Sequence, residues 1–224
     1  MSDFEIRVEL PDKNHYPSFG RKRGSVFYIE DSSGEEKILV PVAVARSLKK
    51  SLDCDEIYLT SRAELFYQLG EIAQRCATQR LANLLNRRDY SCMEVSRKLQ
   101  EDGYTRQTIE KLLEHAKKGR ALDDQRYAAL YIRSKINVGW GPKRIEKELA
   151  LKGINLNEIE GWPEEFIDLE NQTERAYDLV STRSLCGKND FQKLVRFLMS
   201  RGFAMSDAIP AVKRVLKEAV EKEQ

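Results

Sequence analysis

Seven basic residues crowd a short stretch in the second half of the chain, and their charge suits contact with an acidic partner. Between Gln125 and Ile154 only two acids, Glu146 and Glu148, oppose them, which leaves five net positive charges. Crowded like charges destabilise a fold unless a partner relieves the repulsion, so the stretch predicts a binding face or, failing that, an ordinary solvated surface. The seven are Arg126, Arg133, Lys135, Lys143, Arg144, Lys147 and Lys152.

The charge changes sign in the next stretch of the chain. Residues 155–178 hold eight acids and one base, Arg175. Across all 224 residues, 38 basic and 36 acidic side chains leave a formal net charge of +2. A simple polybasic tail is therefore excluded as the binding device, and a surface for an acidic partner has to come from local separation of charge.

Few residues have the types and spacing that catalysis or metal binding needs. Asp123 and Asp124 could form a metal-binding or acid–base pair, but two adjacent acids at the start of a helix usually cap it. The four cysteines have no CxxC spacing, and only His15 and His115 could add imidazole ligands. No glycine-rich phosphate loop, nucleophile elbow or zinc-hydrolase string is present. We therefore predict a protein that is not an enzyme and that uses neither metal nor cofactor.

Two aromatic residues lie close to the basic stretch. Tyr131 falls on the expected apolar stripe of a helix, so we predict that it belongs to the core. Trp140 follows that helix, and both a core position and stacking on a nucleotide base stay open for it.

The chain contains three similar sequence strings, and the second of them holds four of the seven basic residues. The strings are "SCMEVSRKLQEDGY", "GPKRIEKELALKGI" and "NDFQKLVRFLMSRGF", and each contains a glycine near its end. The glycines, Gly103, Gly153 and Gly202, recur after 50 residues (103 to 153) and 49 residues (153 to 202). A leucine precedes each glycine by four residues, and an apolar residue follows it. This spacing predicts a helix that closes on a left-handed glycine, with the leucine packed against the residue after the glycine.

The starts of the same three helices also carry signals. Ser91 and Glu94 have the spacing of a capping box, Pro142 stands at an expected N1 position, and Asn189 is expected to cap the third helix.

Each of these helices carries a base six residues before its glycine: Arg97, Lys147 or Arg196. In the middle helix, Arg144 lies three residues from Lys147, so we predict that both are exposed on one face. In the third string, Arg196 and Arg201 are the corresponding candidates for a partner-binding surface.

The pattern as a whole predicts a mainly α fold. Residues 1–60 are expected to form a small β-rich cap, because "SVFYIE" and "KILVPV" flank a turn string from Asp31 to Gly34. Three-helix, helix-turn-helix-like repeats are then expected over 61–122, 123–171 and 172–224, with Trp162-Pro163 interrupting the last helix of the second. Because such short repeats bury their own faces poorly, we expect them to stack into an elongated tandem array.

The start of the chain bears on its location. It reads "MSDFEIRVEL", with acids where a secretory signal needs bases, and no apolar run reaches membrane-spanning length. We therefore expect a cytoplasmic protein without a membrane partner.

Residues Leu122 to Ile154 resemble the central signature of the RecX regulatory proteins. The resemblance extends to Arg88 through Tyr104 and to Phe191 through Phe203, and covers roughly residues 62 to 220. It implies tandem three-helix modules that bind the RecA recombinase filament on DNA and restrain its activities, in a protein that is expected to be a monomer. The central matches are Tyr127-Ala128, Tyr131, a Gly-Gly turn, Arg144-Ile145, Glu148-Leu149 and Lys152-Gly153-Ile154.

Two other functions stay open at this point. Tandem helix-turn-helix-like modules with a basic middle repeat could bind single- or double-stranded DNA directly, although "PKRIEKELALKG" mixes glutamates with the cations that a recognition helix would present. A passive helical scaffold is the second alternative, and it predicts that the cationic face is dispensable.

Overall fold

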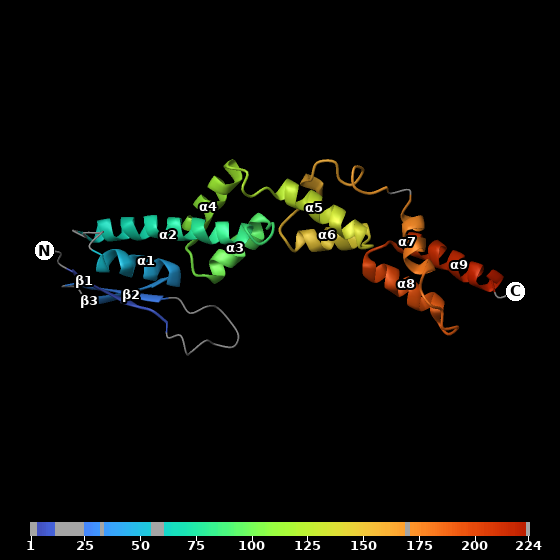
Figure 1. Cartoon of the computed structure of the whole chain (residues 1–224), viewed down its shortest axis with the longest axis horizontal. Helices are drawn as coiled ribbons and strands as arrows, with labels where there is room; N and C mark the ends of the chain where they lie inside the picture. The colour runs from blue at the N-terminus through green and yellow to red at the C-terminus, as the bar shows by residue number, and fades with distance from the viewer. Residues whose placement is uncertain (1–3, 12–24, 32–33, 55–60, 169–170, 223–224) are drawn as a thin grey trace. The chain divides into compact units, whose positions relative to one another are not determined.

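The structure is a computed structural model that describes residues 4–11, 25–31, 34–54, 61–168 and 171–222. Contacts divide the chain into two units, Met1–Leu122 and Asp123–Gln224, and each is considered by itself (Figure 1). The chain is mainly helical, with a small antiparallel sheet at its N-terminus, as predicted. Every helix among the described residues is too short or too polar to cross a membrane.

The sheet of the first unit has three strands, β1 (Phe4–Glu9), β2 (Ser25–Asp31) and β3 (Gly34–Val40), in the order β1-β2-β3. Ile6 pairs with Ile29, and Phe27 pairs with Ile38. Phe27 and Ile29 are fully buried, so alternate residues of the central strand face the core. Ser32 and Ser33 of the predicted turn lie outside the described residues.

Helix α1 (Val42–Asp53) follows the sheet and contacts β1 and β2. The sequence prediction that helices begin near residue 61 is therefore wrong. The string "KILVPV" read as one strand, but Pro41 ends the strand and stands at the N-cap of α1. Val44, Ala45 and Leu48 then have helical spacing and are buried, which a period-two interpretation of the cap overlooked.

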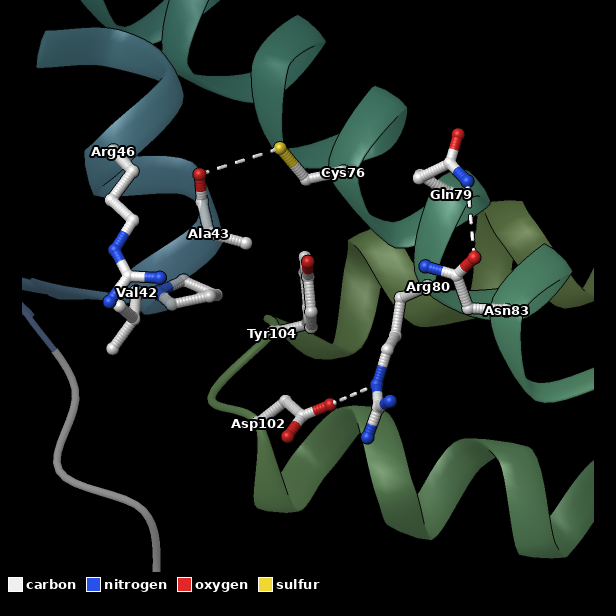
Figure 2. A pocket seen from close by; sticks show the side chains of 10 residues that line it. Val42, Ala43, Arg46, Cys76, Gln79, Arg80, Asn83, Asp102 and Tyr104 are labelled. Carbon is white, nitrogen blue, oxygen red and sulfur yellow. Dashed lines mark hydrogen bonds and ion pairs between the residues drawn. The ribbon is translucent and has the colours of Figure 1, made fainter. Parts of the chain in front are cut away.

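Helices α2 (Arg62–Leu85), α3 (Cys92–Glu101) and α4 (Arg106–Lys118) complete the first unit. The Ser61 side chain caps α2 by accepting a hydrogen bond from the Glu64 amide at 3.2 Å. Buried residues of the sheet and of all four helices form one hydrophobic cluster. A pocket remains between the start of α1, α2 and the turn that joins α3 to α4 (Figure 2).

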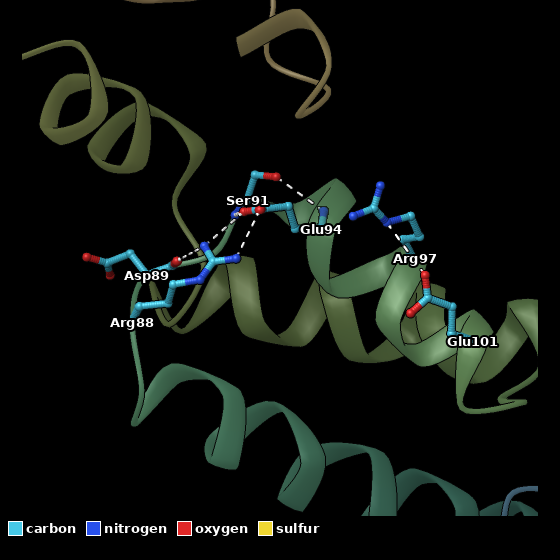
Figure 3. A network of polar contacts seen from close by, with 6 residues as sticks. All are labelled: Arg88, Asp89, Ser91, Glu94, Arg97 and Glu101. Carbon is cyan, nitrogen blue, oxygen red and sulfur yellow. Dashed lines mark hydrogen bonds and ion pairs between the residues drawn. The ribbon is translucent and has the colours of Figure 1, made fainter. Parts of the chain in front are cut away.

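A network of polar contacts fixes the start of α3. Ser91 and Glu94 form the predicted capping box. Arg88 then holds the Glu94 carboxylate with Nη2 at 3.1 Å and Nη1 at 3.4 Å (Figure 3). Its guanidinium also lies 3.7 Å from the centre of the Tyr90 ring. Arg88, Ser91 and Glu94 together therefore fix the start of this helix.

The second unit contains α5 (Asp124–Asn137), α6 (Pro142–Ala150), the 3-10 turn η1 (Leu156–Glu158), α7 (Gln172–Ser181), α8 (Asp190–Arg201) and α9 (Met205–Lys222). One hydrophobic cluster joins α5, α6 and η1, and a separate cluster joins α7, α8 and α9. Each set of helices thus buries an apolar face of its own. This differs from the expectation that such repeats bury their faces mainly against their neighbours.

The connector after α6 contains little regular secondary structure, in agreement with the prediction that Trp162-Pro163 interrupts the last helix of this repeat. Only the 3-10 turn η1 occupies the place of a third helix within its described residues. The Gln125 side chain holds the connector by donating to the Glu158 carbonyl at 2.6 Å and accepting from the Glu160 amide at 3.1 Å. Trp162 and Phe166 pack against the cluster of α5 and α6.

The three recurring glycines close their helices in the same way. Their φ angles are +92° at Gly103, +75° at Gly153 and +94° at Gly202, all in the left-handed region. The next amide in each case donates to the leucine carbonyl five residues earlier, at 3.0, 3.0 and 3.1 Å. This is the Schellman arrangement, and the residues that it brings together are buried: Leu99 with Tyr104, Leu149 with Ile154, and Leu198 with Phe203.

Asn189 stands at the N-cap of α8, but its side chain makes no capping hydrogen bond. Its backbone adopts a left-handed conformation with φ +59°, whereas a capping side chain normally accompanies an extended backbone. The neighbouring Asp190 side chain instead holds the loop before α8, because its Oδ2 accepts hydrogen bonds from the backbone amides of Cys186 and Gly187 at 2.8 and 2.6 Å. The expectation that Asn189 caps the third helix through its side chain is therefore wrong.

Candidate functional site

The structure places the seven crowded cations on two helices and the turn that follows them. Helix α5 begins where Asp123 caps it, since Asp123 Oδ1 accepts from the Arg126 amide at 2.9 Å and Asp124 lies in the first turn. No group of three or more His, Cys, Asp or Glu residues within the described part of the chain could hold a metal ion. Arg126, Arg133 and Lys135 lie on α5, Lys143, Arg144 and Lys147 on α6, and Lys152 just before Gly153.

Three aromatic rings form a row beside these cations. Tyr127 stacks on Tyr131 with ring centroids 6.1 Å apart, and Tyr131 meets Trp140 edge to face at 6.5 Å. Tyr127 is buried, but Tyr131 and Trp140 are only partly buried at the margin of the α5–α6 cluster. Tyr131 packs against the core cluster, as predicted, although it is only partly buried.

Cations lie over this row of rings. The Lys135 ammonium is 5.1 Å from the centre of Tyr131 and 5.0 Å from that of Trp140, while the Arg144 guanidinium is 3.9 Å from Trp140. Lys152 lies 5.5 Å from Tyr131 and 5.9 Å from Tyr127. Such cation–π contacts hold the charges at defined places, so the site presents an ordered set of positive charges.

The Tyr131 phenol keeps its proton in this setting. Burial, assisted by the nearby Glu148 carboxylate, raises the pKa of Tyr131 above its ordinary value. At physiological pH the ring therefore offers a neutral hydroxyl and adds no negative charge to the basic surface.

Arg144 does not share the exposure of Lys147, which corrects the sequence expectation. Its Nη1 donates to the Ser200 carbonyl at 3.2 Å, in addition to its contact with Trp140. Arg201 makes the reciprocal contact, since its Nη1 donates to the Val138 carbonyl at 3.2 Å. Both arginines therefore join the α5–α6 helices to the end of α8.

The main chain makes the same junction. The Gly141 amide donates to the Arg201 carbonyl at 2.8 Å, and the Lys143 amide donates to the Gly202 carbonyl at 3.2 Å. Helix α6 has no side-chain cap, so the carbonyl groups at the end of α8 satisfy amides at its start. The positive end of one helix dipole thereby meets the negative end of the other.

Glycine is required on both sides of this junction. A Cβ atom on Gly141 would lie 2.5 Å from the Gly202 carbonyl group, and a Cβ on Gly202 would lie 2.4 Å from the backbone nitrogen of Arg144. These distances are far below van der Waals contact. Gly202 therefore has a second role beside its left-handed φ, which its place in the repeated string did not indicate.

Arg175 is a structural member of the site that sequence reasoning did not single out. Its Nη2 donates to the Trp140 carbonyl at 3.1 Å, and its Nη1 donates to Gln172 Oε1 at 2.8 Å. Burial lowers the pKa of this guanidinium, and its position fastens α7 to the turn between α5 and α6. The one signal that could have found it is its isolation as a lone base among eight acids.

The remaining cations face solvent. Arg126 and Arg133 are exposed, and Arg133 lies 5.5 Å from the Phe166 ring. We use the name outer cations for Lys143, Lys147 and Arg196, which are exposed and whose side chains form no ion pair with the part of the chain that the structure describes. Apart from Arg126 and Arg133, the predicted partner-binding residues thus separate into a junction pair (Arg144 and Arg201), two lysines over the aromatic row (Lys135 and Lys152) and these outer cations.

Comparison with known proteins places this arrangement in a family. The family model described as RecX, first three-helix domain, matches residues 77–115, and that of RecX, second three-helix domain, matches residues 123–160. The regulatory protein RecX of Actinobacillus pleuropneumoniae serotype 5b is 34% identical over 132 residues, which span 55% of this chain and 82% of the relative. That of Vibrio vulnificus is 32% identical over 126 residues, spanning 54% and 80%.

Solved structures share the fold. A crystal structure of RecX from Lactobacillus salivarius is similar with a TM-score of 0.53 and 22% identity, over 64% of this chain and 96% of that one. A second crystal structure, of a regulatory protein RecX, has a TM-score of 0.53 and 20% identity, over 91% and 96%. From the matched domains and the coverage of its relatives, the chain belongs to the RecX family of regulatory proteins.

Proposed function

We propose that this chain binds the RecA filament on DNA and restrains RecA strand exchange, DNA-dependent ATP hydrolysis and coprotease activity. Membership of the RecX family supports RecA as the partner. The observation that carries the binding surface is the exposure of the outer cations without acidic partners among the described residues. A filament of protein on nucleic acid offers the repeated negative charge that such a surface would neutralise.

The other cations support the same surface in a different way. Lys135, Lys152 and Arg144 are held over aromatic rings, and Arg144 and Arg201 join α6 to α8. We assign these residues to the ordering of the surface and the outer cations to contact with the partner. No nucleotide or metal is needed by the chain in this scheme, and its place of action is the cytoplasm, where RecA filaments assemble.

Direct DNA binding is a second function that the same charges could serve. A direct DNA-binding protein needs only naked DNA, whereas the proposed regulator needs RecA assembled on DNA. We would measure binding of the chain to single-stranded DNA alone, to duplex DNA alone, to RecA alone and to the assembled filament, each at several salt concentrations.

The filament proposal predicts binding to the assembled filament that is clearly tighter than binding to either component. It also predicts that added salt weakens this binding, because exposed charges are screened and counterions are released. Equal affinity for naked DNA and for the filament would instead identify a plain DNA-binding protein. Saturating protein that leaves RecA activity unchanged would contradict the proposal altogether.

A further inference from the structure

The pocket of the first unit has a volume of about 340 Å³, which is at the lower end of the sizes that hold small ligands. Its wall is formed by the first residues of α1, by one face of α2 and by the α3–α4 turn (Figure 2). It belongs to Met1–Leu122 and contains none of the cations assigned above to partner binding. Its function is therefore a separate question.

Tyr104 lies in the middle of this pocket, with its ring between α1 and α2 (Figure 2). The residue is only 7% exposed, yet its hydroxyl has no hydrogen-bond partner among the described residues. Among the described residues, Ser25 Oγ is the one fully buried side-chain oxygen or nitrogen without a partner, so the Tyr104 hydroxyl is not sealed in the core but opens into the pocket, where a ligand can reach it. Burial raises the pKa of Tyr104 well above its ordinary value, so the group remains a hydroxyl that can donate a hydrogen bond.

The start of α1 also faces the pocket with unused donors. Pro41, Val42 and Ala43 line the wall, and no side chain caps this 12-residue helix. Its first turn contains no acid. The first amides of a helix carry partial positive charge and bind oxyanions when no cap satisfies them.

Two arginines, Arg46 and Arg80, add full positive charges to the partial charges of the helix amides. Arg46 lies one turn into α1 and forms no ion pair with the described residues, whereas Arg80 is held by Asp102 at 2.7 Å. Asp102 is thus already neutralised, and the charge of Arg46 is left over. Cys76 closes the wall as a neutral thiol, because burial raises its pKa, and its Sγ lies 3.7 Å from the Ala43 carbonyl.

We propose that this pocket binds a small phosphate monoester of nucleotide size. Its phosphate would lie at the start of α1, where the first amides, the Arg46 guanidinium and the Tyr104 hydroxyl can all donate to its oxygens. A guanidinium combined with helix-start amides is a common phosphate-binding set in proteins. The organic part of the ligand would rest on the apolar wall near Cys76 and Pro41.

The test uses the full chain and follows the backbone amide signals of Val42 and Ala43 by NMR. The probes are adenosine 5′-monophosphate, inorganic phosphate and adenosine. We expect saturable shifts of both amides with the monophosphate and weaker ones with phosphate alone, which separates a nucleotide from a free anion as the ligand. Adenosine should leave these amides unchanged.

Two variants and one control decide whether the contacts are those proposed. Arg46→Ala should weaken monophosphate binding by about tenfold, since a charged hydrogen bond is lost, and Tyr104→Phe should weaken it by a smaller factor. Lys49→Ala removes an equal charge from α1 at an exposed residue outside the pocket and should have no effect. The proposal is overturned if no saturable shift appears up to about 10 mM probe, if adenosine binds equally well, or if Lys49→Ala matches Arg46→Ala.

Discussion

At the scale of single residues, cations that look equivalent in the sequence have different surroundings. Arg144 and Lys147 are three residues apart on α6, yet Arg144 contacts a carbonyl group and a tryptophan ring while Lys147 is exposed. Substitution of the two residues therefore tests different properties. The first tests the junction between helices, and the second tests contact with a partner.

Charge reversal of each residue by itself should show this difference. Arg144→Glu loses the bond to the Ser200 carbonyl and the contact with Trp140, and it brings a carboxylate towards carbonyl groups, so we expect a loss of about 1 to 3 kcal/mol. Lys147→Glu should change stability by no more than about 0.5 kcal/mol. Urea denaturation of both variants checks the prediction, and equal stabilities would show that Arg144 has no role in the junction.

Gly153 offers a test of the helix stops. Its φ of +75° is strained for any other residue, and Gly153→Val should also disturb the contact between Leu149 and Ile154, at a cost of roughly 1 to 3 kcal/mol. Gly70 is the control, because it lies within α2 with a negative φ and open space around a new Cβ. Gly70→Ala should stabilise the chain by about 0.5 to 1 kcal/mol. A melting temperature of Gly153→Val equal to that of the wild type would refute the stop.

At the scale of helices and strands, the features that the sequence predicted correctly are those set by residues close together in the chain. The capping box at Ser91 and the stops at Gly103 and Gly153 depend on residues three to five positions apart, so their hydrogen bonds follow from spacing. Helix α1 was overlooked because its apolar residues continue a strand-like string across Pro41.

Contacts between distant segments could not be predicted in this way. The junction of α6 with α8 joins residues about sixty positions apart, and its hydrogen bonds are mostly to main-chain carbonyls, which every residue type carries. Nothing in the residue types around Arg201 signals which carbonyl it meets. The candidate cations were therefore predictable as a group, but their division into junction and outer residues was not.

The junction can be tested with two glycines that have the same local role. Gly103 and Gly202 both close a helix, at φ +92° and +94°, but a Cβ on Gly103 has its nearest neighbour at 4.0 Å while one on Gly202 would overlap Arg144. Gly103→Ala should cost about 1 kcal/mol from backbone strain alone. Gly202→Ala should cost roughly 1 to 3 kcal/mol more, because α8 has to move away from α6.

Thermal denaturation and amide hydrogen exchange measure both effects. In Gly202→Ala, the amides of Gly141 and Lys143 should exchange faster, since their acceptors are the carbonyls at the end of α8. In Gly103→Ala they should stay protected. Equal destabilisation by the two substitutions, with unchanged protection at Gly141, would mean that the junction adds nothing to stability.

At the scale of the whole molecule, the two units carry different proposed functions. The first unit joins the sheet and α1 to α2–α4 through one hydrophobic cluster and contains the pocket proposed to bind a phosphate monoester. The second unit carries the junction and the outer cations. The proposed partner surface and the proposed ligand pocket can thus be disabled separately, and loss of one should leave the other in place.

Reversal of Lys143 and Lys147 together tests the central claim, which is that outer cations bind the RecA filament. The matched control is the double variant Lys213→Glu/Lys217→Glu, which has the same spacing of four residues on an exposed face of α9 in the same unit. Both variants should remain folded, because each substitution is at the surface. Circular dichroism and melting temperature confirm this before activity is compared.

The deciding measurement is inhibition of RecA DNA-dependent ATP hydrolysis by the two folded variants over a range of concentrations. We predict that Lys143→Glu/Lys147→Glu needs at least about tenfold more protein for half-inhibition, since two charge contacts with the filament become repulsive, while the α9 control inhibits like the wild type. A folded Lys143→Glu/Lys147→Glu variant that inhibits RecA as well as the wild type would contradict the claim.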